Sequence, residues 1–580
     1  MAQSLLEMLK VQNAPGRSSS YRRLEHLLAV VTLLLGLLHT WTGRYAMNPD
    51  GMSYLDVGSS FFRHDWANAI NAWWSPLYAW TIGTVLGIFK PSPAWEFPLV
   101  HAVNFGVYAI ALATFRFLLH GLIALRATIA NSIESIPDWP LVLLAYPLFW
   151  WVALQVDPIY EITPDLAVVA CLLAIAGKLV RLQRVRSLGR INSLGNFALL
   201  GLILGIGYWT KAVLFPLGFV ALALAYFWNR SDANWRTGVV VAALVFLGVS
   251  SPLIFLLSKQ KGRFTFGDSG RVNFAWYVCP TPRPPHRNWQ GSPYTGTPAH
   301  TTRQLLDHPP VFEFDGPVSG TYPPWTDPSY WNEGIQGHFR VKPELDVLRI
   351  TIPGEFRLLT RDQPALVVGV LVFALIGGLA WWANVARLWP VLALAFTGMA
   401  IYLPLVDNDR FFGGFVLVIF LSLFWAGQFL AEQKRTVVCL SLAVFVTMSL
   451  NTIDYTLRVL THHYAIPGVA PNSTWEDVIA AQQLQRLGLR PGDKVAVIGD
   501  GTGAYWARLA KLKVVAEIMA MNHGSEEFWN SPPEIKENAY KAFASAHATK
   551  VIAACPGNPP AIPDSWQGIP GTAYCIRSVP

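Results

Sequence analysis

Long apolar runs separated by short basic segments restrict the fold of this chain more than any other feature. Residues 27–41, 366–383 and 411–430 are each near the length that a helix needs to cross about 30 Å of hydrocarbon. Only 14% of the 580 residues are charged and 53% are hydrophobic, whereas soluble domains carry roughly 25% charged residues. The sequence therefore predicts a polytopic α-helical membrane protein.

The apolar runs predict about 11–12 membrane helices, with boundaries uncertain by several residues. The predicted spans are 26–42, 98–118, 141–156, 165–181, 195–210, 213–228, 237–257, 364–384, 388–405, 411–430 and 436–453. One further run, 77–89, has about the length of a re-entrant or interfacial helix. It is either an ordinary short span or a segment that does not cross the bilayer.

The basic clusters favour the second interpretation. They lie at 10–23, 116–126, 178–190, 230–236, 387 and 434–435. If 77–89 does not cross, all of them fall on the cytoplasmic side, as the positive-inside rule requires. If it crosses, the most basic loop, 178–190, moves outside. The net charge of +8 is explained by these clusters, so we expect no nucleic-acid partner.

This topology divides the chain into five parts. They are a cytoplasmic N-terminus (1–25), a transmembrane module (26–257) with a first outward loop (43–76), a large extracytoplasmic loop (258–363), C-terminal membrane helices (364–454) and an extracytoplasmic domain (455–580). Residues 1–23 are polar and basic, so we expect the first span to be a retained anchor. The predicted location is the inner (plasma) membrane.

The C-terminal residues predict a small α/β domain. Strands are predicted at 494–498, 514–518 and 550–554, and helices at 504–510 and 534–546. Ser473 and Glu476 fit a capping box that opens another helix, ending near 487. Cys555 and Cys575 could pair if the domain lies outside the cell, which would leave Cys279 over.

Two carboxylates follow the first span closely, in the sequence Asn48-Pro-Asp-Gly-Met-Ser-Tyr-Leu-Asp56. At the membrane surface, Asp50 could act as a general base that takes the proton of an attacking hydroxyl. Tyr54 and Asp56 would contact the substrate. The structural alternative is that Asp50 caps a helix and that Asp56 is solvated.

A second acidic segment lies between two spans and would face the same side as Asp50. It contains Asp157, Glu161 and Asp165, with no basic residue among them. Carboxylates gathered at a bilayer surface are costly unless they are used or neutralised, so they could hold a divalent cation or the hydroxyls of a sugar. The alternative is helix capping, because Thr163-Pro164-Asp165 suits the start of the next span.

Two isolated cations also fall on the outward side. Lys211 lies between two spans beside aromatic residues, where it could bind a lipid phosphate; the alternative is a snorkelling lysine. Arg410 precedes a span and could clamp a phosphate through its planar fork. Its alternative is an interfacial ion pair with Asp407 or Asp409.

Gly499-x-Gly501-x-x-Ala504 follows a predicted strand, and Glu517 lies near the end of the next one. This pattern superficially matches a dinucleotide fingerprint. The domain is small and predicted to lie outside the cell, so a tight glycine turn is the preferred explanation.

Several short elements then occur in a familiar order. They are Pro49-Asp50-Gly51 with Tyr54, His64-Asp65-Trp66, Ser75-Pro76-Leu77-Tyr78, Thr163-Pro164-Asp165, Gly205 through Lys211, and Arg410-Phe411. In order and outward placement they resemble the GT-C superfamily of polytopic glycosyltransferases, especially the protein O-mannosyltransferases and lipid A aminoarabinose transferases. The resemblance covers roughly residues 25–230, then weakly 360–455. Gly51 stands where the family often has Glu, and Ser75 where some members have a basic residue.

The resemblance implies a GT-C-like fold and transfer of a sugar from a polyprenyl-phosphate donor to a glycan, glycolipid or protein acceptor. Asp50 would be the base, and Asp165 would be a second catalytic group that orients the acceptor or binds a divalent cation. Asp157 and Glu161 would bind substrate, and Lys211 and Arg410 the donor phosphate. Two other interpretations stay open, a lipid or glycolipid flippase and a non-catalytic subunit for envelope-polysaccharide assembly.

Overall fold

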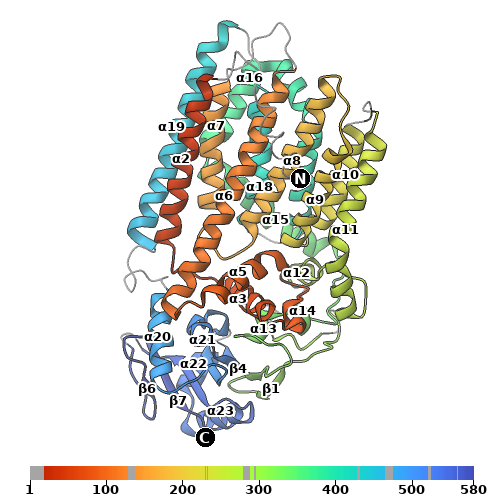
Figure 1. Ribbon diagram of the computed structural model, residues 1–580. Helices are drawn as coiled ribbons and strands as arrows, with labels where there is room; N and C mark the ends of the chain where they lie inside the picture. The colour runs from red at the N-terminus through yellow and green to blue at the C-terminus, as the bar shows by residue number, and fades with distance from the viewer. Residues whose placement is uncertain are drawn as a thin grey trace.

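The computed structural model describes residues 19–128, 138–228, 230, 233–278, 288–292, 295–405, 408–427, 431–463, 474–519, 524–557 and 560–580. These residues form a helical bundle, an intermediate layer of short helices and an α/β region (Figure 1). Cys279 and Asp407, both singled out in the sequence, lie outside the described residues.

Every predicted span coincides with a helix of the bundle. The helices are α2 (Ser19–Thr42), α6 (Pro93–Arg126), α7 (Asp138–Trp151), α8 (Asp165–Ser187), α9 (Leu194–Thr210), α10 (Leu214–Trp228), α11 (Trp235–Lys261), α16 (Pro364–Arg387), α17 (Trp389–Tyr402), α18 (Gly413–Trp425) and α19 (Lys434–Arg458). Among the described residues, six helices are long and apolar enough to cross a membrane by length and composition alone. The chain is therefore a multi-pass membrane protein.

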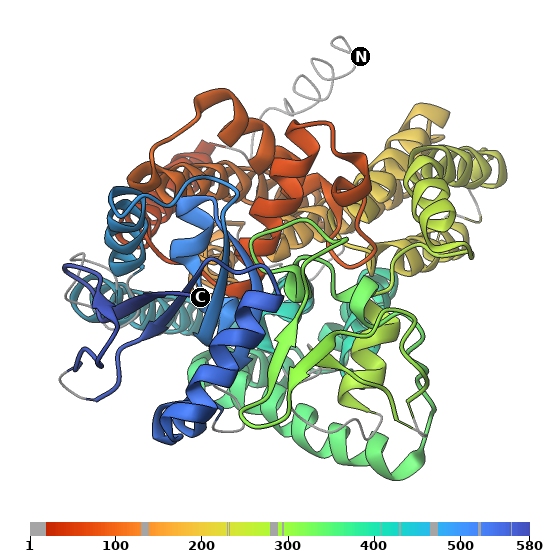
Figure 2. The same cartoon turned by 90° about the horizontal axis from the view of Figure 1, so that it is seen from below.

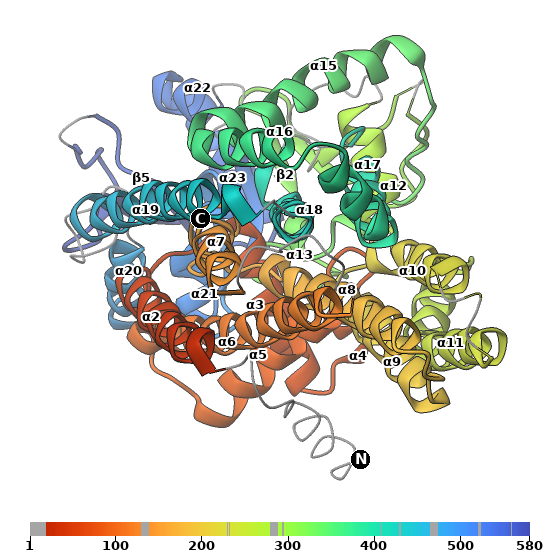
Figure 3. The same cartoon turned by 90° about the horizontal axis from the view of Figure 1, so that it is seen from above.

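The bundle is packed around α7. Residues 140–151 of this helix are all buried, and Figure 3 shows α7 enclosed by α2, α6, α18 and α19. The peripheral helix α16 behaves in the opposite way, since Leu375 and Leu379 are 81% and 88% exposed. Apolar side chains that point outward from a bundle are expected where the surrounding solvent is lipid.

A layer of short helices separates the bundle from the α/β region (Figure 1). It contains α3 (Pro49–Phe62), α4 (Trp66–Ala69), α5 (Pro76–Phe89), α12 (Ser269–Tyr277), α13 (Pro323–Thr326) and α14 (Pro328–Trp331). A side chain on Gly83 of α5 would overlap the backbone of Gly58 in α3, so glycine at both positions allows the helices to meet closely. This is the place that a non-crossing helix at 77–89 would take.

The α/β region contains a seven-stranded mixed sheet in the order β1-β2-β4-β3-β5-β7-β6. The strands are β1 (Arg303–Leu306), β2 (Val311–Glu313), β3 (Lys494–Gly499), β4 (Lys513–Met519), β5 (Lys550–Ala554), β6 (Gln567–Gly568) and β7 (Tyr574–Ser578). The predicted strands β3, β4 and β5 form its parallel centre. Strand β2 pairs antiparallel with β4, so the sheet recruits part of the long loop and extends beyond the predicted domain boundary at 455.

Helices cover both faces of this sheet. α20 (Trp475–Arg486) and α21 (Tyr505–Ala510) pack on one face. α22 (Gly524–Asn530) and α23 (Pro533–Ser545) pack on the other. Figure 2, which looks from the α/β side, shows the sheet and its helices covering one part of the bundle.

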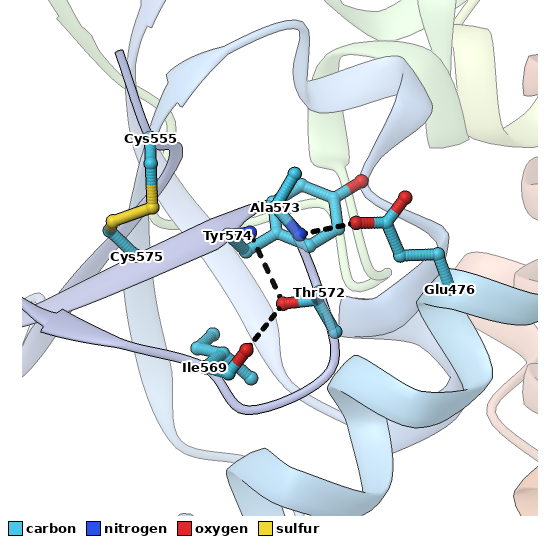
Figure 4. The surroundings of a disulfide bond; sticks show 7 residues. All are labelled: Glu476, Cys555, Ile569, Thr572, Ala573, Tyr574 and Cys575. Atoms are coloured by element: carbon cyan, nitrogen blue, oxygen red, sulfur yellow. Dashed lines mark hydrogen bonds between the residues drawn. A yellow bond between two sulfur atoms is a disulfide. The ribbon is translucent and has the colours of Figure 1, made fainter. Parts of the chain in front are cut away.

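The predicted disulfide is confirmed, but the capping box is not. Cys555 and Cys575 are bonded, with their Cα atoms 5.3 Å apart. Thr474 is the N-cap of α20, and Ser473 lies outside the described residues. The carboxylate of Glu476 accepts a hydrogen bond from the backbone N–H of Ala573, beside the disulfide (Figure 4). Glu476 therefore joins α20 to the β6–β7 hairpin rather than capping its own helix.

Asp477 makes the stability of the α/β region depend on pH. Burial, with a contribution from Glu476, raises the pKa of Asp477 to about 7, whereas an unfolded Asp titrates near pH 3.9. Between about pH 4 and 7 the folded state therefore holds a proton that the unfolded state has lost. Its stabilising contribution is complete below about pH 4 and disappears as the pH rises to 7.

We expect Asp477→Asn to raise the Tm at pH 8, because the amide fills the same site without a charge, and to change it little at pH 4. The measurement is the thermal unfolding of purified protein in detergent at both pH values. An equal shift at the two pH values would contradict the assignment.

Candidate active site

The predicted site residues come from four elements that meet where the bundle faces the layer of short helices. Asn48 caps α3 by accepting from the N–H of Gly51, which places Asp50 in the first turn. Asp165 is the first residue of α8, and Lys211 directly follows α9. Arg410 belongs to η4 (Asp409–Phe411), a short turn before α18.

Arg410 lies at the centre of this cluster and joins three carboxylates. Its Nη2 is 2.8 Å from Oδ2 of Asp50, its Nη1 is 3.4 Å from Oε2 of Glu161, and its Nε is 3.4 Å from Oδ2 of Asp165. Burial alone would lower the pKa of Arg410, but Asp165 and Asp50 reverse this effect and raise it. The guanidinium is therefore a permanent cation beside the predicted base.

Lys211 completes the cluster from the opposite side of Asp165. Its Nζ pairs with Oδ1 of Asp165 and lies 4.0 Å from the ring centroid of Phe411. Burial lowers the pKa of Lys211, with Asp165 acting against this effect. Lys211 and Arg410, which come from distant segments, thus both contact the carboxylate of Asp165. A bound dianion could take the place of this carboxylate as the partner of both cations.

Asp157 differs from the other acids of the cluster because no ion pair joins it to a cation among the described residues. Both carboxylate oxygens are buried without a hydrogen-bond partner among the described residues. Burial, followed by the charge of Asp165, raises the pKa of Asp157 well above its usual value. Asp157 lines a small cleft with Asn104, Glu161 and Asp165. Burial also raises the pKa of Glu161.

Trp325, on the long loop, is a site residue that the sequence did not suggest. Its Nε1 donates to Oδ1 of Asp50 at 3.2 Å. Its carbonyl accepts from Ser53 Oγ at 2.7 Å and from Trp74 Nε1 at 3.1 Å. Both the backbone carbonyl and the indole N–H of Trp325 are therefore hydrogen-bonded, and Trp325 and Arg410 each contact one oxygen of Asp50.

Tyr54 is buried among aromatic side chains, one of which, Trp74, also contacts Trp325. It is 5% exposed and packs edge-on against Trp74 and Tyr78. Burial, followed by the charges of Asp165 and Asp50, raises the pKa of Tyr54 well above its usual value. Direct contact with substrate, as predicted, would need this ring to become accessible.

Asp56 does not join the cluster. Oδ1 of Asp56 is 2.9 Å from Nη1 of Arg508 in α21, and Oδ2 accepts from the N–H of Thr321 at 2.7 Å. The Nε of Arg508 is also 2.8 Å from Oε1 of Glu96. Asp56 is neither solvated nor placed to meet the substrate beside Asp50; it fixes α3 to the α/β region.

In the α/β region, the side chain of Tyr322 occupies the space beside the glycine turn at residues 499–504. The hydroxyl of Tyr322 donates to the buried carboxylate of Glu517, and the Tyr322 ring lies against Gly501. The acid that a nucleotide ribose would need is therefore engaged by the long loop. This geometry agrees with the prediction of a structural turn.

No protein-family model and no curated protein matches the sequence. Similarity appears among solved structures. The Archaeoglobus fulgidus oligosaccharyltransferase in complex with Zn and sulfate has a TM-score of 0.50 at 14% identity, covering 91% of this chain and 68% of that chain. The same enzyme, AglB, with an inhibitory peptide and a dolichol-phosphate gives 0.49 at 12% identity, covering 92% and 70%.

ArnT from Cupriavidus metallidurans bound to undecaprenyl phosphate gives a TM-score of 0.45 at 12% identity, covering 96% of this chain and 98% of that chain. The likeness to the oligosaccharyltransferase confirms the predicted GT-C-like fold. At 14% identity it concerns the fold, so the activity is inferred from the site.

Proposed function

We propose that this chain is a membrane glycosyltransferase that moves a sugar from a polyprenyl-phosphate donor to an extracytoplasmic glycan, glycolipid or protein acceptor. One observation carries the proposal: Arg410 Nη2 lies 2.8 Å from Oδ2 of Asp50. A group able to bind phosphate and a group able to accept a proton thus lie next to each other, as transfer of a phosphate-linked sugar requires.

The reaction would be a single displacement with inversion. Asp50 takes the proton of the acceptor hydroxyl while its oxygen forms a bond to the anomeric carbon. The bond from that carbon to the donor phosphate oxygen breaks, and the electron pair stays on the phosphate. Lys211 and Arg410 stabilise the charge that develops there, while Asp165 and Glu161 orient hydroxyl groups.

The donor would also free the base. In the described structure Arg410 and Trp325 each engage one oxygen of Asp50. A phosphate that draws Arg410 away leaves Oδ2 open for the acceptor, with Oδ1 still held by Trp325. We therefore expect the donor to bind before the acceptor.

The carboxylates do not present a metal site in this arrangement. No group of three or more His, Cys, Asp or Glu side chains within the described residues is placed to hold a metal ion. Asp50, Glu161 and Asp165 are instead engaged by Arg410. The possible divalent cation stays a proposal for this chain, and no step above passes through it.

Two features support an extracytoplasmic site in a plasma membrane. The disulfide joins Cys555 and Cys575 on the side of the bundle that carries the site, and disulfides persist in oxidising compartments. Most of the predicted basic loop 178–190 forms the C-terminal end of α8, whose first residue, Asp165, is in the site. The loop therefore lies toward the other end of the bundle, where the positive-inside rule places the cytoplasm.

Loss of either phosphate-binding cation tests the donor assignment. We expect Lys211→Met and Arg410→Met each to weaken binding of undecaprenyl phosphate by about 10–100-fold, because a hydrogen bond to a charged group is worth about 1.5–3 kcal/mol. The measurement is lipid-induced thermal stabilisation of purified protein. Lys261→Met is the control, since Lys261 pairs with Glu333 outside the cluster.

Unchanged lipid binding in both variants would remove the phosphate site. Product formation from a polyprenyl-phosphate sugar, measured in proteoliposomes beside transbilayer movement of the same lipid, separates the transferase from a flippase. Movement without transfer would favour the flippase, and neither process would favour a non-catalytic subunit.

Trp325 offers a test of how the base is held. Trp325→Phe keeps the ring among its neighbours and removes the N–H that reaches Asp50. We expect turnover to fall by about tenfold, on the order of one hydrogen bond to a charged acceptor, with the KM for the donor unchanged. The control is Trp276→Phe, because Trp276 stacks on Trp325 but donates to Asn332. Equal losses in both variants would indicate packing alone.

A further inference from the structure

The long loop contains a helix whose outer surface is unusual for a segment expected in water. This helix, α15 (Val341–Arg357), continues through η3 (Leu358–Asp362) directly into α16 of the bundle. Figures 2 and 3 show α15 lying lengthwise along one edge of the molecule, across the direction of the bundle helices. Its side chains divide into three faces.

The first face is turned toward the protein and is polar. Glu344, Thr351 and Glu355 are 9%, 1% and 7% exposed. Thr351 Oγ1 donates to the carbonyl of Leu403 at 2.9 Å, near the end of α17 and close in sequence to Arg410. α15 is therefore fastened to the end of the bundle that carries the candidate site.

The second face is apolar and points away from the protein. Val341, Leu345, Ile352 and Phe356 are 63%, 47%, 51% and 64% exposed. Their spacing of 4, 7 and 4 residues places them on one line along a helix of 3.6 residues per turn. Burying each such side chain is worth about 1.5–3 kcal/mol, so a stripe of four is not expected to face water.

The third face is cationic and lies beside the apolar stripe. At 100° per residue, Lys342 and Arg349 lie about 50–70° from the centre of the stripe, and Arg357 lies about 130° from it. All three are exposed, and within the part of the chain that the structure describes only Arg349 forms an ion pair with an acid of this helix, Asp346 at 3.1 Å. Apolar side chains flanked by cations are the pattern of a helix that lies in a membrane interface.

The next helix in the chain also exposes large apolar side chains. Leu371, Leu375 and Leu379 of α16, the helix that follows α15 in the chain, are 58%, 81% and 88% exposed. A helix that lies across the direction of the bundle helices at the end of α16 would meet the bilayer at the level of the headgroups.

We propose that α15 is an interfacial helix that lies on the leaflet nearest the candidate site. Its apolar stripe enters the acyl chains, and Lys342, Arg349 and Arg357 bind anionic lipid headgroups. The inference stands apart from the proposed enzyme function, because it uses neither Asp50 nor the phosphate-binding cations. It assigns part of the loop 258–363 to the membrane surface rather than to the aqueous phase.

The test uses full-length protein with Cys171, Cys279 and Cys439 replaced by Ser. Ile352→Cys carries a nitroxide in nanodiscs of phosphatidylcholine, with or without one fifth phosphatidylglycerol. The spin label at 352 is expected to be several-fold more accessible to oxygen than to a water-soluble nickel chelate. The same label in Asp346→Cys, on the exposed polar side of α15, is the control and is expected to show the reverse.

Adding phosphatidylglycerol is expected to move the label at 352 deeper into the bilayer. The combined substitutions Lys342→Gln, Arg349→Gln and Arg357→Gln are expected to abolish this shift. If the combined substitutions remove this shift and leave the other accessibilities of the label unchanged, the effect is due to charge and not to misfolding. Equal nickel accessibility at 352 and 346 would overturn the proposal. Dipolar broadening between labels at 352 would also overturn it, because a second copy of the chain would then cover the stripe.

Discussion

Asp50→Asn is expected to lower the turnover of a polyprenyl-phosphate sugar by about 10²–10⁴-fold, the usual cost of removing a general base. The amide has the shape of the carboxylate and can still accept from Trp325, but it cannot take a proton. It also no longer pairs with Arg410, so binding of undecaprenyl phosphate should be unchanged or tighter. Turnover and lipid affinity are therefore expected to move independently.

The measurement is single-turnover transfer by purified protein, with lipid binding followed in parallel. Asp454→Asn is a matched control, since Asp454 is an exposed acid paired with Arg458 outside the cluster. Near-normal transfer by a folded Asp50→Asn protein would reject Asp50 as the base. Weakened lipid binding would place Asp50 in the phosphate site instead.

Arg508→Ala is expected to destabilise the protein by about 3–5 kcal/mol, because breaking a buried ion pair leaves an uncompensated charge. Here two buried carboxylates, Asp56 and Glu96, would lose the same guanidinium. The loss would free α3, which carries Asp50, from the α/β region. Thermal unfolding in detergent measures the effect, and Arg490→Ala, an exposed arginine of the same region, is the control.

A combined variant distinguishes lost charge balance from lost packing. If the penalty comes from stranded carboxylates, Arg508→Met with Asp56→Asn and Glu96→Gln should be more stable than Arg508→Met alone. A triple variant that is less stable than the single one would show that the geometry of the clamp, rather than its charge, holds α3.

The sequence predicted the bundle well because each span is a continuous apolar run, and such a signal is local. It also predicted strands β3, β4 and β5, whose buried residues are contiguous in the chain. Strands β1 and β2 have only four and three residues, which is too short for alternation to be recognised. The helix α15 was not predicted, although its apolar stripe has helical spacing, because Pro353 lies inside it and a proline usually ends or kinks a helix.

The candidate site was partly predictable for the same reason. Asp50, Asp165, Lys211 and Arg410 each lie at the end of an apolar run, and the topology placed all of them on one side. Trp325 and Arg508 are different, since they contact Asp50 and Asp56 across 275 and 452 residues. No local pattern reports such contacts, and Asp56 was consequently placed beside the substrate.

The pairing of β2 with β4 has a consequence for biosynthesis. β2 is made before α16, α17, α18 and α19, and β4 after them, so the two strands can meet only if the intervening chain crosses the bilayer an even number of times. A single failed insertion would leave the partners in different compartments, with the edge of β4 unpaired. The β2–β4 pair can therefore form only when the last four membrane helices have the correct topology. A chain with the wrong topology would expose the edge of β4 to quality-control proteases.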